Sequence, residues 1–166
     1  MDLRPLDRAR DVHHVERLWL EYLTWGNDAL HETYGFRLPV REAVDTDLAN
    51  LDKFQPPDGR LLLAFHDDVP VGVGCLRRIG DDTGEIKRMY VQPSHRRSGL
   101  GRGLVDALVT AAREIGYRRL RLDSPIFLTA AHALYRSREF VDIPPYAESG
   151  IPDRYNSNWV FMERAL

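Results

Sequence analysis

The thirty residues "EIKRMYVQPSHRRSGLGRGLVDALVTAARE", positions 85–114, decide the fold of this chain. Their first seven residues alternate in the manner of a β-strand, which Pro93 ends. One predicted face of the strand carries Glu85, Lys87, Met89 and Val91, and the other carries Ile86, Arg88 and Tyr90. Residues 100–115 follow helical spacing instead, with an apolar stripe and Gly116 as a stop signal. The stretch therefore predicts a strand, a glycine-rich turn and an amphipathic helix in direct succession.

The turn "RRSGLGRG", residues 96–103, combines glycines and arginines directly before the helix. The first four amides of a helix have no partners inside it, and the helix dipole adds a partial positive charge there. Glycines let a ligand approach the backbone closely, so such a turn can bind phosphate groups. The turn alone leaves a second interpretation open, a tight loop with solvated arginines.

Two well-known phosphate-binding motifs do not fit this turn. A P-loop needs a Lys followed by Ser or Thr, and the chain contains no such pair. The dinucleotide motif G-x-G-x-x-G accepts Gly99 and Gly101 as its first two glycines, but its third position falls on Leu104. Both motifs are therefore excluded.

A third motif fits. Arg96-x-x-Gly99-x-Gly101, between a strand and an amphipathic helix, resembles the Q/R-x-x-G-x-G/A loop of the GNAT N-acetyltransferase superfamily. The whole of residues 85–114 is similar to the strand–loop–helix core of that family. "YRRLRLDS" (117–124) resembles its next strand, and "AAHALYRSREF" (130–140) resembles its A-x-x-L-Y-x-x-x-G-F segment. The resemblance covers residues 60–164, whereas residues 7–58 match only in predicted topology.

The remaining pattern agrees with this family's architecture. Helices are predicted over 11–25, 40–51 and 129–138, and strands over 60–65, 69–79, 117–124 and 157–166, with a polar loop over 144–156. We expect an α/β fold with a mixed, mostly antiparallel twisted sheet of six to seven strands flanked by helices. Residues 1–166 are expected to form a single domain, since this length favours one domain over two.

The resemblance implies acetyl-CoA as co-substrate. The strand before the turn would hold the pantetheine arm through its backbone, and the amides of the turn would hold the pyrophosphate. The implied cofactor-binding residues are Met89, Tyr90, Val91, Arg96, Arg97, Ser98, Gly99, Leu100, Gly101, Arg102 and Tyr135. The implied reaction is direct transfer of the acetyl group to a primary amine in a ternary complex.

Two residues are candidates for the catalysis. An alkyl ammonium titrates near ~10.4 and must lose a proton before it attacks, which requires a general base. Glu85 has the spacing of the family's strand glutamate, although it could instead be a surface residue paired with Lys87. A thiolate leaving group needs a proton, and Tyr135 stands where the family has its general acid; alternatively, Tyr135 is an aromatic core residue.

Two positions depart from the family pattern, and the acceptor site is hard to read. Leu128 replaces an asparagine that contacts the cofactor in many members. Glu139 replaces a glycine that ends the helix in a left-handed conformation; either Glu139 adopts that conformation at a cost of roughly 1 kcal/mol, or the helix ends differently. The acceptor could meet residues of the first helical region or the late loop, namely Glu32, Tyr34, Asp45, Tyr146, Asp153 and Tyr155.

Bulk composition limits the remaining functions. A formal net charge of −2 argues against nucleic acid as a partner, and one cysteine provides neither a disulfide framework nor a zinc pattern, so no metal is expected. Without a signal peptide or an apolar run of ~18 residues, we expect a cytoplasmic protein that does not bind membranes. The acceptor is expected to be a small-molecule amine or a peptide, and a homodimer is compatible with the resemblance. The alternative function is a non-catalytic acyl-CoA-binding sensor.

Overall fold

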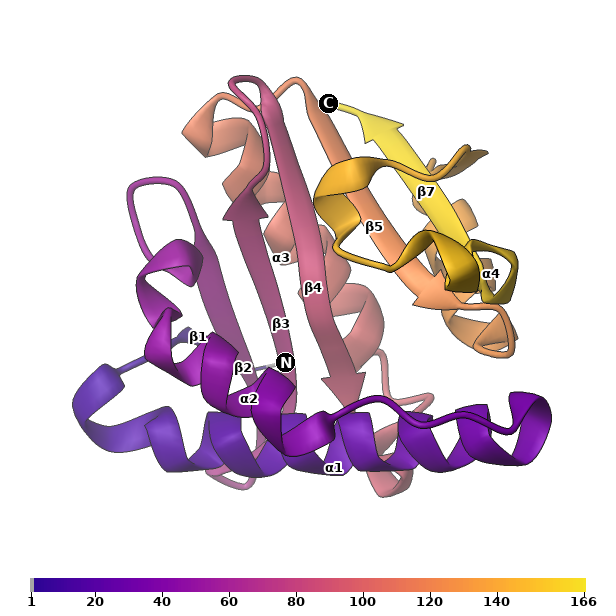
Figure 1. Ribbon diagram of the computed structural model, residues 1–166. Helices are drawn as coiled ribbons and strands as arrows, with labels where there is room; N and C mark the ends of the chain where they lie inside the picture. Colours follow the sequence, from indigo (N-terminus) through magenta and orange to yellow (C-terminus); the bar gives the residue numbers. More distant parts are fainter. Residues whose placement is uncertain (1) are drawn as a thin grey trace.

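The computed structural model describes residues 2–166, which form a seven-stranded sheet in the order β1-β2-β3-β4-β5-β7-β6 (Figure 1). The strands are β1 (Asp2–Pro5), β2 (Arg60–His66), β3 (Val69–Arg78), β4 (Thr83–Val91), β5 (Arg119–Pro125), β6 (Val141–Ile143) and β7 (Trp159–Ala165). Only β4 and β5 pair in parallel, and the other neighbours are antiparallel. The predicted mixed α/β fold with up to seven strands is therefore confirmed.

Helices cover the two faces of this sheet (Figure 1). The α-helices are α1 (Arg8–Tyr34), α2 (Val40–Ala49), α3 (Leu100–Ile115) and α4 (Thr129–Arg136), and the short 3-10 helices are η1 (Leu51–Phe54), η2 (Pro93–His95), η3 (Ala147–Ser149) and η4 (Asp153–Asn158). One hydrophobic core lies between α3 and the sheet, and a second lies between the sheet and α1 with α2. The sheet thus has a face toward α3 and a face toward α1.

Helix α1 is longer than the predicted helix over 11–25. Asp7, rather than Asp11, caps its start, because the Asp7 carboxylate accepts a hydrogen bond of 3.0 Å from the amide of Ala9. The helix ends at Gly35, whose φ of 76° is left-handed. Asn27 in the last third of α1 exchanges two hydrogen bonds with the backbone of Leu38, which fixes the connection to α2.

Strand β4 contains a bulge that changes the predicted alternation of its side chains. Val73 of β3 pairs with Tyr90 and Cys75 pairs with Lys87, so one residue of β3 lies opposite two of β4. Arg88 lies at the bulge with a left-handed φ of 54°. As a result, Met89 packs in the α3 core and not on the face of Glu85 and Lys87, while Tyr90 belongs to the α1 core. The prediction that Glu85, Met89 and Val91 share a face was wrong because one extra residue reverses the alternation.

Strands β4 and β5 pair over a short length only. Their register joins Thr83–Glu85 to Arg119–Arg121, and no β5 partner faces β4 beyond Glu85. The bulge at Arg88 lies three residues after Glu85, in the part of β4 that is no longer paired with β5. Side chains of both strands line a cavity beyond this point.

Helix α4 ends at Arg136, two residues before the predicted end, and the structure decides between the two alternatives for Glu139. Glu139 adopts a left-handed φ of 64° in the position that the family fills with glycine. Its carboxylate accepts a hydrogen bond of 2.6 Å from Arg164 of β7. This ion pair offsets part of the conformational cost of a non-glycine residue there.

Candidate active site

The turn before α3 presents a row of backbone donors. Arg97 and Gly99 have φ angles of 64° and 89°, and this backbone path turns the chain into the helix. The amides of residues 97–102 make no hydrogen bond within residues 2–166, and the next amide, that of Gly103, is the first to bond back, to Gly99. Six consecutive free amides at a helix N-terminus fit a diphosphate group.

The arginines of the turn contribute less than its backbone. Arg96 donates to the carbonyl of Val91 at 3.1 Å, and its guanidinium carbon lies 4.9 Å from the ring centroid of Trp25. Arg97 and Arg102 are exposed. The guanidinium of Arg96 is therefore directed toward α1.

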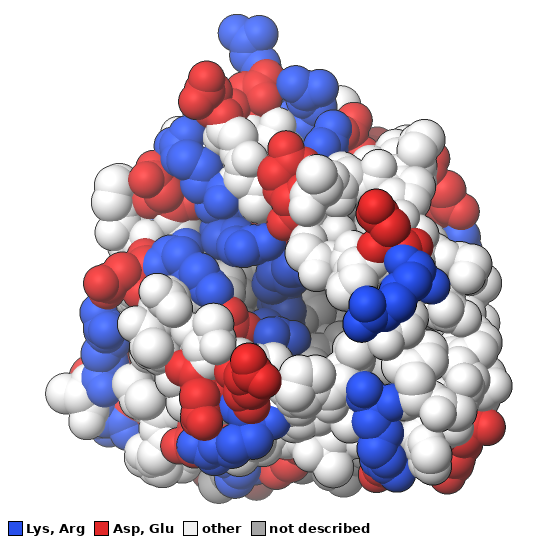
Figure 2. Space-filling view, viewed as in Figure 1, with Lys and Arg blue, Asp and Glu red and all other residues white. Residues whose placement is uncertain are grey.

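A cavity of about 580 Å³ lies where β4 and β5 part. Its walls come from α1, α2, the ends of β4 and β5, α4 and residues 149–152. Figure 2 shows a hollow on this face with basic side chains gathered along its wall. The charged residues that line the cavity are Glu42, Asp47, Lys53, Arg77, Lys87, Arg88 and Asp123. The cavity is therefore polar on its charged wall, although leucines and prolines complete it.

Tyr135 lines this cavity from α4 and is only 7% exposed. Its ring packs edge-on against Phe140, with centroids 5.9 Å apart. Burial, together with the nearby Tyr22 and Asp123, raises the pKa of Tyr135 above that of a free phenol. Its hydroxyl therefore stays protonated at neutral pH and can donate a hydrogen bond or a proton.

Glu85 is fully buried and is absent from the residues that line the cavity. One carboxylate oxygen accepts a hydrogen bond of 2.6 Å from Arg77, and the other accepts one of 2.8 Å from the hydroxyl of Tyr146. The ammonium of Lys87 lies 3.4 Å from the second oxygen. Burial raises the pKa of Glu85, although the charges of Lys87 and Arg77 oppose this. Its pairing with Lys87 agrees with the alternative interpretation, but it is not a surface residue.

Asp123 is a site residue that the sequence reasoning missed. It lies near the carboxyl end of β5, lines the cavity and forms an ion pair with Lys87. The signal that could have found it is its position, because ligands bind beyond the carboxyl ends of parallel strands in open α/β sheets. The structure thus joins Glu85, Lys87 and Asp123 in one chain of charges that ends at the cavity.

A second ionic cluster joins α2 to the bulge. Asp47 accepts hydrogen bonds from Arg88, at 2.7 Å, and from Lys53. Burial alone would raise the pKa of Asp47, but the charges of Arg88 and Lys53 lower it below its ordinary value. The side chain of Arg88 reaches this cluster because of the bulge, which no pattern in the sequence indicated.

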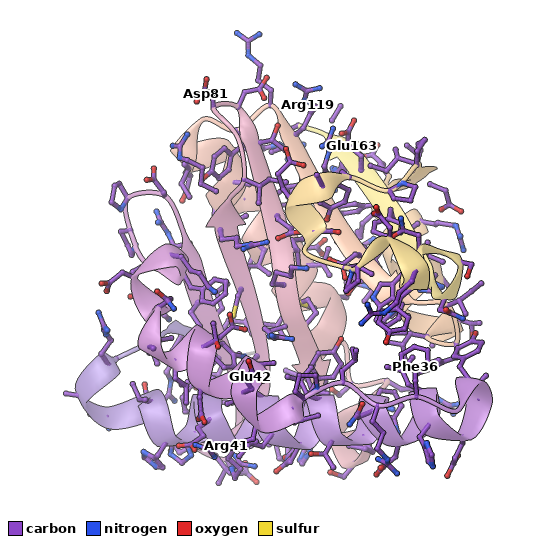
Figure 3. All side chains as sticks on the ribbon, in the orientation of Figure 1. Phe36, Arg41, Glu42, Asp81, Arg119 and Glu163 are labelled. Carbon is purple, nitrogen blue, oxygen red and sulfur yellow. The ribbon has the colours of Figure 1, made fainter. Side chains whose placement is uncertain are left out.

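The acceptor-wall residues predicted from the sequence do not line the cavity. Glu32, Tyr34 and Asp45 are exposed on α1 and α2, and Tyr155 stacks on Phe36 with centroids 4.3 Å apart. Phe36 lies in the α1–α2 connection (Figure 3). On α2, Glu42 faces the opening of the sheet, whereas Arg41 lies toward α1 (Figure 3) and pairs with Glu16.

The other two predicted wall residues lie in the late loop. Tyr146 is buried against Glu85, and Asp153 is exposed at the start of η4. The six named residues do not line the cavity, because they are exposed or packed against other residues. The two segments still contribute to its wall through Leu38, Pro39 and residues 149–152, so the prediction that they border the acceptor stays a prediction.

A polar pair lies beside Tyr135. His132 Nε2 lies 3.1 Å from the hydroxyl of Ser124, and both residues are buried. Burial lowers the pKa of His132, so it is neutral at pH 7. Ser124 and Leu128 both line the cavity, and Leu128 occupies the position where the family pattern has an asparagine.

Two searches for other kinds of site were negative within residues 2–166. No group of three or more His, Cys, Asp or Glu side chains in this range is arranged to hold a metal ion. None of the helices described is both long enough and apolar enough to cross a membrane.

Comparisons with known proteins identify the family of this chain. The model of the acetyltransferase (GNAT) family matches residues 27–140. An IAA acetyltransferase of Azospirillum brasilense is 35% identical over 128 residues, which are 75% of this chain and 79% of that protein. An uncharacterized N-acetyltransferase of Schizosaccharomyces pombe is also 35% identical, over 148 residues, which are 87% of this chain and 85% of that protein.

A solved structure shows the same fold. The paia N-acetyltransferase of Thermoplasma acidophilum, crystallised in complex with coenzyme A, superposes with a TM-score of 0.74 over all of both chains at 14% identity. With the family match over residues 27–140 and the two relatives at 35% identity, this chain is an acyltransferase that belongs to the GNAT acetyltransferase family.

Proposed function

We propose that the protein transfers the acetyl group of acetyl-CoA to a primary amine, by direct attack in a ternary complex. The observation that carries the proposal is the presence of two features in one chain: six backbone amides without partners, at residues 97–102, and a cavity that Tyr135 lines. The coenzyme A in the structure of the Thermoplasma relative supports the choice of cofactor.

The chain holds the cofactor mainly through its backbone. The amides of Arg97 to Arg102 bind the pyrophosphate, and the backbone of Met89, Tyr90 and Val91 runs beside the pantetheine arm, where β4 has no β5 partner. When bound, acetyl-CoA supplies an activated thioester. The side chains of Arg96, Arg97 and Arg102 add charge near the phosphates.

Two side chains move protons. The hydroxyl of Tyr135 donates a proton to the departing thiolate, since its raised pKa keeps it protonated until then. Glu85 accepts the proton that the attacking amine releases. Because Glu85 does not line the cavity, that proton reaches it through an intervening water molecule. Its raised pKa makes the carboxylate of Glu85 a stronger base than a free carboxylate.

The test is an acceptor screen with acetyl-CoA, monitored by thiol release, followed by two substitutions. We expect Tyr135→Phe to lower kcat by about 10²–10³-fold and Glu85→Gln to lower it by about 10-fold or more, both with little change in acetyl-CoA affinity. Tyr34→Phe is the matched control, because Tyr34 is exposed and lies outside the cavity. Full activity of both variants would contradict the assigned roles.

The same experiment separates the enzyme from a sensor. A non-catalytic acyl-CoA sensor would bind acetyl-CoA tightly in calorimetry and release no thiol with any amine. The position of Tyr135 in the cavity wall favours the enzyme.

A further inference from the structure

One wall of the cavity offers a carboxylate oxygen and no free cation. Asp123 Oδ2 is paired with Lys87, whereas Oδ1 receives no hydrogen bond within residues 2–166. The ammonium of Lys87 also donates to the carbonyl of Ser149 at 2.9 Å and lies 3.4 Å from Glu85. The ammonium of Lys87 therefore already has two hydrogen-bond acceptors and a further ion-pair partner, and this wall suits a ligand that brings its own N–H donors.

Another wall offers the opposite. Both oxygens of Asp47 are engaged, one by Lys53 and one by Arg88 Nε and Nη2. Arg88 Nη1 makes no hydrogen bond among the described residues. Lys53 uses one of its three N–H groups for Asp47, so two remain for a ligand. These two side chains are 21% and 29% exposed. This wall therefore presents cationic donors, and its buried carboxylate, that of Asp47, is already paired.

The two walls belong to one cavity. Lys87 and Arg88 are neighbours in β4, so the two ionic clusters are separated by a single step of the backbone. The basic side chains that Figure 2 shows along the hollow belong to this region. Glu42 also lines the cavity, but it is exposed on α2. Arg77 adds a further guanidinium, which is held by Glu85 and the carbonyl of Glu148.

From this arrangement we infer that the acceptor is an amino acid or another small aminocarboxylate. Its ammonium group meets Asp123, and its carboxylate meets Arg88 and Lys53. This inference rests on the proposed function and names the substrate class of the same site. A plain amine or an amidated amino acid leaves the donors of Arg88 and Lys53 without a charged partner, so both are poorer acceptors.

The first test uses matched acceptors. Each of the twenty amino acids is compared with its α-amide and its decarboxylated amine, at one acetyl-CoA concentration, with thiol release as the readout. We expect the best acids to exceed their amides in kcat/KM by about 30-fold, roughly the value of a charge-assisted contact that is partly exposed. Equal rates for acids, amides and decarboxylated amines would overturn the inference and leave the proposed function intact.

A binding measurement separates the two claims. Calorimetry on the protein saturated with CoA should show binding of an amino acid that its α-amide does not match. If no amine is acetylated but this binding difference is found, the proposed function fails, and only the class of ligand bound by the cavity stands. If amines are acetylated but acid and amide bind alike, the substrate class fails.

The second test uses variants. Lys53→Met should reduce the ratio of acid to amide rates by about 5–10-fold, while Arg41→Met, on the side of α2 that faces α1, should leave the ratio unchanged. Asp123→Asn should lower kcat/KM for acids and amides together by about 10-fold or more, without changing CoA affinity by more than about 2-fold. An unchanged ratio in Lys53→Met and unchanged rates in Asp123→Asn, in folded proteins, would overturn the assignment.

Discussion

The two sides of the site are made in different ways. Toward α3, the polar groups without partners are backbone amides of residues 97–102, positioned by glycines and a helix start. Toward α1 and α2, the polar groups are charged side chains from five separate segments, held by ion pairs. Backbone groups depend only on local conformation, whereas ion pairs depend on which distant segments meet. The first side should tolerate loss of its charged side chains, and the second should not.

The largest effect is expected at the ionic side. Asp47→Asn should lower the free energy of unfolding by about 3 kcal/mol at pH 7, because it leaves Arg88 and Lys53 without a buried counter-charge. The exposed neighbour Asp45, which pairs with Arg41, provides the control; Asp45→Asn should cost less than about 0.5 kcal/mol. Chemical denaturation measures both values.

The pH dependence of this difference has a definite sign. The pKa of Asp47 is lower in the folded protein than its ordinary value of 3.8, so its contribution is present above about pH 4. As the pH falls through the folded pKa, the carboxylate gains a proton and the contribution is lost. The stabilities of Asp47→Asn and the parent should therefore converge below about pH 4. A constant difference down to acid pH would show that charge is not its source.

The backbone side should respond to a change of conformation. Gly99→Ala places a side chain at a φ of 89°, and we expect it to displace the amide row and weaken acetyl-CoA binding by about 10–100-fold. Gly116→Ala, at the other end of α3 with a φ of 96°, imposes a similar strain away from the turn. Calorimetry with CoA should show weakened binding for the first variant only. Equal effects would mean that strain in the helix, and not the amide row, is responsible.

The smallest effect is expected from the charge on that same side. Arg102→Ala removes an exposed guanidinium and should weaken acetyl-CoA binding by only about 2–5-fold, with the difference shrinking at high salt. The measurement is CoA affinity at two ionic strengths. A loss larger than that of Gly99→Ala would reverse the comparison between backbone and side chains.

The sequence predicted the segments whose signals are local. The bounds of α3, residues 100–115, are confirmed, because an apolar stripe and a C-terminal glycine define a helix without outside help. The left-handed conformation of Glu139 is one of the two alternatives that the sequence left open. The order of strands and helices followed from the spacing of apolar residues. Helix α1 begins at Arg8, with Asp7 as its cap, which is earlier than the predicted start at residue 11.

Other features depended on tertiary structure. The bulge at Arg88 leaves no mark in an alternating strand, so the faces of Met89 and Tyr90 were assigned wrongly. Asp47 and Asp123 are 76 positions apart and share a cavity only after folding. No sequence periodicity indicates such a contact, and for this reason the residues named for the acceptor wall differ from those that line the cavity.

The attachment of the polar loop, residues 144–156, affects which mutations this enzyme can accept during evolution. Arg77 and Lys87 bind the carbonyls of Glu148 and Ser149, so the loop is fastened by peptide groups that every residue type provides. Mutations that change the side chain of the exposed Glu148 keep this attachment. A lineage can therefore vary that position without detaching the rim of its binding site, which makes the loop a natural place for new acceptor preferences to arise.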